Sequence, residues 1–124
     1  MESSCSNDDD EITPKEEDAR YYVKYEATIH TFSVKTTKYI SFSNEEGSQI
    51  LTFNDKKQNI QWEGTYGPVT KDFIANLDCS SASYDDTSIY ARISVCKDKE
   101  PFVVKAEGSQ TKGNYLSLTN KIDF

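Results

Sequence analysis

Apolar residues in this chain recur at every second position, the pattern of a β-strand with one buried face and one wet face. The clearest run spans residues 21 to 29, where one face carries Tyr21, Val23, Tyr25, Ala27 and Ile29. The opposite face of the same segment is polar and carries Tyr22, Lys24, Glu26, Thr28 and His30. Helical periodicity is nearly absent. The sequence therefore predicts an all-β fold whose sheets each keep one face in water.

Shorter runs repeat the alternation along the chain. Expected strands are marked by the pairs Ile40 and Phe42, Leu51 and Phe53, and Ile60 and Trp62, by residues 70–80, 88–97 and 102–106, and by Leu116, Leu118, Ile122 and Phe124. Turn or loop signals separate them at residues 44–47, 55–59, 64–68, 83–88, 97–100 and 107–113. Seven or eight short strands at regular spacing predict an antiparallel β-sandwich or a small barrel.

The charge of the chain is concentrated at one end. The net charge is −7, and residues 1–18 hold eight acids and one base, while the remaining 13 acids and 13 bases balance. A polar, like-charged segment buries too little surface to order itself, so residues 1–18 are predicted to form a disordered tether and residues 19–124 the folded domain. The neutral body has no basic stripe, which argues against nucleic acid as a partner.

The start of the tether resembles a mature Bacteroidetes lipoprotein. Ser4 and Cys5 are followed by an acidic run, Ser6, Asn7, Asp8, Asp9, Asp10 and Glu11. In such proteins a signal peptidase cuts before the cysteine, the cysteine is acylated, and the acidic run acts as a surface-export signal. The resemblance implies lipidation at Cys5 and an export signal at residues 6–11. The basic and apolar regions that normally precede the cysteine are missing here, so lipidation requires a longer precursor; the alternative is an acidic tail with an incidental cysteine.

The other two cysteines are Cys79 and Cys96. Strand parity places Cys79 on an apolar face with Leu77, and Cys96 on the polar face of its own strand. If the two strands pair directly, the sulfurs lie on opposite sides, and a bridge would need a β-bulge. The parity favours a small buried Cys79 and a Cys96 at a strand end. Neither cysteine has metal-ligand spacing with His30, so no metal site is predicted.

Catalytic chemistry finds little support in the sequence. His30 is the single histidine and lies on the polar face of a strand, without a nucleophile motif beside it. Asp85 and Asp86 are adjacent in a predicted hairpin loop, where turn chemistry accounts for them better than a calcium site. We assign no catalytic residue and no cofactor, and expect the chain not to be an enzyme.

Trp62 and Tyr66 are the candidates for ligand binding. Aromatic side chains at loop tips stack on sugar faces, and the neighbouring Glu63 and Thr65 would supply polar partners. The alternative for Trp62 is a place in the core, as for many single tryptophans of small β domains. The sequence favours the core for Trp62 and exposure for Tyr66.

The order of several patches is similar to the extracytoplasmic domain of the mycobacterial small membrane protein (MmpS) family and its Bacteroidetes lipoprotein relatives. The patches are residues 22–27, 40–44, 62–64, 67–69, 73–77 and 90–98. The resemblance implies an immunoglobulin-like sandwich, and the mycobacterial members assist lipid and siderophore exporters. Those members carry a transmembrane helix where this chain has Cys5.

Together these observations predict a non-catalytic envelope lipoprotein, anchored by lipid to the outer membrane and exposed at the cell surface. Its domain would contact a protein partner as an accessory of a surface or transport complex. The alternative is a surface module that binds glycans.

Overall fold

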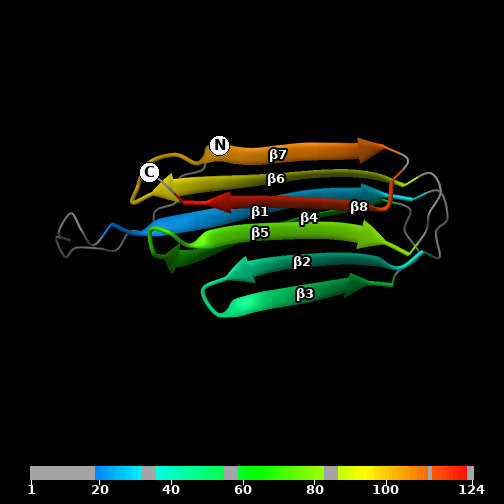
Figure 1. The fold of residues 1–124 in the computed structure, drawn as a ribbon, viewed down its shortest axis with the longest axis horizontal. Helices are drawn as coiled ribbons and strands as arrows, with labels where there is room; N and C mark the ends of the chain where they lie inside the picture. The colour runs from blue at the N-terminus through cyan, green and yellow to red at the C-terminus, as the bar shows by residue number, and fades with distance from the viewer. Residues whose placement is uncertain (1–18, 32–35, 55–58, 83–86, 112, 123–124) are drawn as a thin grey trace.

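A computed structural model describes residues 19–31, 36–54, 59–82, 87–111 and 113–122. These residues form eight β-strands (Figure 1), named β1 (Tyr21–His30), β2 (Lys38–Asn44), β3 (Gly47–Phe53), β4 (Asn59–Val69), β5 (Ile74–Ser81), β6 (Ser88–Lys97), β7 (Val103–Thr111) and β8 (Tyr115–Lys121). Within these ranges no helix is long and apolar enough to cross a membrane. The all-β prediction is confirmed.

The strands form two antiparallel sheets of four, which makes the domain a β-sandwich. The first sheet has the order β4-β1-β6-β7 and the second the order β3-β2-β5-β8. Two hairpins, β2–β3 and β6–β7, each stay within one sheet, and every other connection crosses between the sheets. Such crossing connections are typical of sandwiches.

The core follows the alternation of the central strands. In β1 the five residues at odd positions are each at most 5% exposed. Their neighbours on β6 are also apolar, with Ile29 opposite Ile89 and Ala27 opposite Ala91. The second sheet faces them with Ile40, Phe42, Ala75, Leu77 and Cys79, all buried. Each fully buried aliphatic side chain contributes roughly 1.5–3 kcal/mol relative to an exposed one, so this interlayer packing is the main stabilising contact of the domain.

The β2–β3 turn forms where its residues predict it. The Asn44 side-chain Oδ1 accepts a hydrogen bond from the Glu46 backbone N–H at 2.8 Å, an Asx-type contact that closes the turn. Gly47 has a φ of 112°, a conformation that side chains with a Cβ rarely adopt. The expected turn at residues 44–47, with glycine in its last position, is therefore confirmed.

Two predicted breaks in the chain are wrong. The glycines and proline of residues 64–68 were expected to end a short strand, but β4 continues to Val69. The segment 107–113 was expected to be a loop, but β7 continues to Thr111. Both are edge strands, where a proline or glycine costs fewer ladder hydrogen bonds than it would inside a sheet.

Candidate functional site

The lipidation and export residues predicted from the sequence lie outside the described residues. This applies to Cys5 and to the acidic run of residues 6–11, which precede Ala19, the first described residue. Asp85 and Asp86, the adjacent carboxylates of a predicted hairpin loop, also lie outside the described residues.

Trp62 and Tyr66 lie two residues either side of Gly64 in β4, not at a loop tip. Both side chains are half-buried and pack against the core, so the expectation that Tyr66 is exposed is wrong. Phe42 of β2, in the opposite sheet, packs against both rings. Its ring centroid is 5.1 Å from that of Trp62 and 4.9 Å from that of Tyr66.

Four rings form an aromatic cluster: Tyr25, Phe42, Trp62 and Tyr66. The cluster depends on Gly64, which has no side chain. A Cβ at Gly64 would lie 2.6 Å from the Tyr66 hydroxyl and 3.0 Å from the Trp62 ring. Glycine at this position therefore leaves the space that the Tyr66 hydroxyl and the Trp62 ring occupy. The fourth member, Tyr25, is fully buried and donates its hydroxyl hydrogen to the Ser43 backbone carbonyl at 2.6 Å. Burial raises the pKa of Tyr25, which keeps the phenol neutral and donating.

A shallow polar depression lies on the outer face of the first sheet. It has a volume of about 310 Å³. The polar side chains that line it come from three adjacent strands: Glu26, Thr28, Gln61, Glu63, Tyr90 and Arg92. The register explains their meeting, because Glu26 pairs with Glu63 on β4 and with Arg92 on β6. Trp62 also borders the depression.

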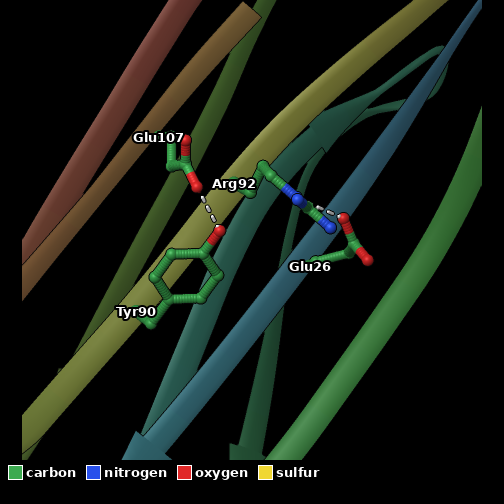
Figure 2. Close-up of polar contacts among 4 residues, drawn as sticks. All are labelled: Glu26, Tyr90, Arg92 and Glu107. Carbon is green, nitrogen blue, oxygen red and sulfur yellow. Dashed lines mark hydrogen bonds and ion pairs between the residues drawn. The ribbon is translucent and has the colours of Figure 1, made fainter. Parts of the chain in front are cut away.

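Two polar contacts fix the side chains of β6 at this depression. Figure 2 shows Arg92 directed to Glu26 of β1 and Tyr90 directed to Glu107 of β7. The Arg92 Nε donates to Glu26 Oε1 at 2.8 Å, and the Tyr90 hydroxyl donates to Glu107 Oε2. The hydrogen bond to Glu107 raises the pKa of Tyr90, and the hydrogen bond to Glu26 raises that of Arg92.

The chemistry of the depression is that of recognition. Its phenol, amide, guanidinium and carboxylates offer hydrogen-bond donors and acceptors in fixed positions. A solute with several hydroxyl groups would find partners there, and the aromatic ring of Tyr90 adds an apolar surface.

A second candidate surface is the outer edge of β3. This strand ends its sheet and pairs with β2 alone, so half of its backbone N–H and C=O groups have no strand beside them. Its sequence from Gly47 to Phe53 contains no charged residue and no proline. Ile50, at its middle, is 70% exposed. Natural edges are usually protected by charges, prolines or bulges, and β3 has none of these within its span.

The other three edge strands differ from β3. β4 carries Glu63 and has Pro68, which has no N–H to donate, next to its last residue. β7 and β8 pack against each other across the sheets, and a Cβ at Gly108 would lie 3.3 Å from Leu118. β7 also carries Lys105 and Glu107. Among the described strands, β3 therefore presents the edge best suited to pairing with another chain.

The remaining candidates from the sequence are isolated. His30 is exposed at the end of β1. Cys79 is buried, as strand parity predicted, and its thiol is free. Burial raises the pKa of this thiol to about 12. Cys96 is disulfide-bonded and lies in the other sheet, so the open question of a Cys79–Cys96 bridge is answered: it does not form. The condition of direct strand pairing is not met, because β5 and β6 lie in different sheets. The placement of Cys96 on a polar face is wrong, because the residue is fully buried near the end of β6. The described part of the chain contains no group of three or more potential metal ligands.

One buried polar cluster was not predicted from the sequence. Thr31, Lys38 and Thr87 are fully buried at one end of the sandwich, together with Ser81. The Lys38 Nζ donates to the Thr36 carbonyl at 3.2 Å, and the hydroxyls of Ser81 and Thr87 are 3.1 Å apart. The available signal was parity, because Lys38 shares the alternation of Ile40 and Phe42 and so belongs to the inner face.

The comparisons with known proteins give no relative. No protein-family model, no curated protein and no solved structure matches this chain. The resemblances to Bacteroidetes lipoproteins and to the small membrane protein family remain predictions.

Proposed function

We propose that the protein is a non-catalytic envelope lipoprotein whose β-sandwich makes protein contacts as an accessory of a surface or transport complex. The anchor would be a lipid on Cys5, which attaches the chain to the outer membrane, and the acidic run of residues 6–11 would direct it to the cell surface. Acyl chains bind membranes in proportion to the methylenes they bury, about 0.8 kcal/mol each.

The open edge of β3 carries the proposal of protein contact. An extended segment of a partner can add to such an edge, because main-chain hydrogen bonds supply affinity and alternate side chains supply specificity. Ile50 would lose its 70% exposure in such a contact, which adds an apolar contribution.

An immunoglobulin-like topology is part of this proposal. Its support is the pairing of β1 with β4 in one sheet and the order β3-β2-β5 in the other, joined by connections that cross between the sheets. This arrangement also agrees with the proposed kinship to the extracytoplasmic domain of the small membrane protein family.

The second candidate function is glycan binding, and the polar depression of the first sheet favours it. Tyr90 and the charged pair Glu26–Arg92 there would hold a sugar by its hydroxyls and its apolar face. The two functions predict different sensitive residues. Tyr90→Ala would abolish glycan binding and leave protein contact unchanged, whereas Ile50→Lys would do the reverse.

The contact proposal is tested by cross-linking in the native host. A photoreactive amino acid replaces Ile50 in one strain and, as a matched control, the exposed Ser109 of β7 in another. We expect a discrete protein adduct at position 50 and none at position 109. Equal labelling at both positions, or none at position 50, contradicts the proposed role of β3.

A further inference from the structure

The uncharged edge of β3 is complementary to itself. We propose that a second copy of this chain pairs with it, β3 against β3 in antiparallel orientation about a two-fold axis at Ile50, so that two four-stranded sheets become one of eight. This inference rests on the proposed role of β3 as a contact edge and names the partner. Figure 1 shows β3 at the margin of the sandwich, with β2 as its neighbour in the sheet.

The register follows from the symmetry. A two-fold axis at Ile50 places that residue opposite its own copy, Ser48 opposite Thr52, and Gln49 opposite Leu51. Side chains of successive residues alternate between the faces, so Ser48, Ile50 and Thr52 would form one continuous outer row across both copies. Apolar residues then meet at the centre and hydroxyls flank them. Cross-strand pairs of this kind stabilise a sheet.

The absence of charged residues distinguishes β3 as the edge that a second copy can pair with. When a strand pairs with itself, each charge approaches a like charge, and like charges directly opposite each other are destabilising. β4, β7 and β8 all carry charged residues, namely Glu63, Lys105, Glu107 and Lys121. β3 has no charge over its seven residues. Self-pairing there has no repulsion within the strand and would cover its exposed isoleucine.

The symmetry also gives the test. Position 50 faces itself, so Ile50→Lys places two ammonium groups together, and Ile50→Glu places two carboxylates together. Each variant alone should be a monomer, and an equimolar mixture of the two should form a heterodimer. Ile50 is an exposed residue, so neither substitution removes a core contact. Ile50→Thr is the control that keeps a β-branched, uncharged side chain.

Sedimentation equilibrium measures the mass of the full chain in solution. Protein concentrations up to about 1 mM detect a dimer with a dissociation constant as weak as about 1 mM. We expect the wild type to approach twice its 14.1 kDa monomer mass with increasing concentration, with and without a reductant. The dissociation constant should rise at least about tenfold in each charged variant, less in Ile50→Thr, and recover in the lysine–glutamate mixture.

Several results would overturn the inference. β3–β3 pairing at this register is excluded by any of three results. These are a wild type that stays monomeric, a dimer that dissociates when reductant is added, and a lysine–glutamate mixture that does not associate. The proposed function fails separately: a monomer in solution whose position 50 still cross-links to another protein in the host refutes the second copy but keeps the contact edge. A monomer with no adduct at position 50 refutes both.

Discussion

Phe42 should be the most sensitive single residue of the aromatic cluster. It is 4% exposed, and its ring contacts three others, with centroid distances of 5.5 Å to Tyr25, 5.1 Å to Trp62 and 4.9 Å to Tyr66. Truncating a buried phenylalanine to alanine typically lowers the free energy of unfolding by about 3–5 kcal/mol. Each aromatic pair contributes about 0.5–1.5 kcal/mol beyond its area. We therefore expect a loss of about 4 kcal/mol for Phe42→Ala.

Two further substitutions separate burial from ring geometry. Phe42→Leu keeps most of the apolar volume and loses the ring contacts, so its cost should be about 1–2 kcal/mol. Phe102→Ala is the matched control, because Phe102 is only half-buried and its ring lies 5.6 Å from the Lys24 Nζ. A cation–π contact of this exposed kind contributes about 0.5–1 kcal/mol, so Phe102→Ala should cost about 1 kcal/mol.

Urea unfolding followed by the fluorescence of Trp62, the single tryptophan, is the assay. For a domain of this size the denaturant slope is about 1–2 kcal/mol per molar urea, so Phe42→Ala should lower the midpoint by about 2–4 M. If Phe42→Ala unfolds before urea is added, Phe42→Leu carries the comparison. A loss from Phe42→Leu well below about 1 kcal/mol would refute the view that the aromatic cluster closes this side of the core.

Three other predictions concern titration and charge. Burial raises the pKa of Tyr25 above 10.0, so stability is retained below pH 10 and falls as the pH rises through the folded-state pKa; Tyr25→Phe should flatten that alkaline fall in thermal melts. The buried Cys79 thiol, with its pKa raised to about 12, should resist iodoacetamide at pH 8 until urea unfolds the chain, and rapid native labelling would contradict its burial. Arg92→Met breaks the pair with Glu26, whose side chains are 35% and 23% exposed, and should cost at most about 1 kcal/mol in low salt and less in high salt; a larger, salt-independent loss would contradict a surface ion pair.

Local alternation was enough to predict strands and faces. The inner row of β1, from Tyr21 to Ile29, is buried as its apolar residues indicate, and its outer row carries Glu26 and Thr28 of the depression. The same rule applied to β2 would have placed Lys38 inside. Residue type misled there, because a lysine is almost never fully buried unless it is paired.

Edge position could not be read from the sequence. Gly64 and Pro68 are common in turns, yet β4 continues through them because it has a neighbour on one side only. The depression was also hidden, because Tyr90 and Arg92 meet Glu107 and Glu26 through strand pairings across two interfaces. Such long-range order is set by the packing of the two sheets, which alternation alone does not determine.

Anchoring of the chain by Cys5 is the central claim, and intact mass with membrane fractionation tests it most directly. The protein is expressed from its native locus, as the wild type and as Cys5→Ala, and weighed before and after reduction. Lipidation and disulfide formation are alternative fates of a cysteine thiol, because an acylated sulfur cannot form a disulfide. The chain has three cysteines, of which Cys79 is free and Cys96 is disulfide-bonded, so the mass before and after reduction distinguishes a lipid on Cys5 from a disulfide. We predict a lipid-sized mass increase that survives reduction and partition with the outer membrane, both lost in Cys5→Ala. A soluble protein without added lipid mass would contradict the account.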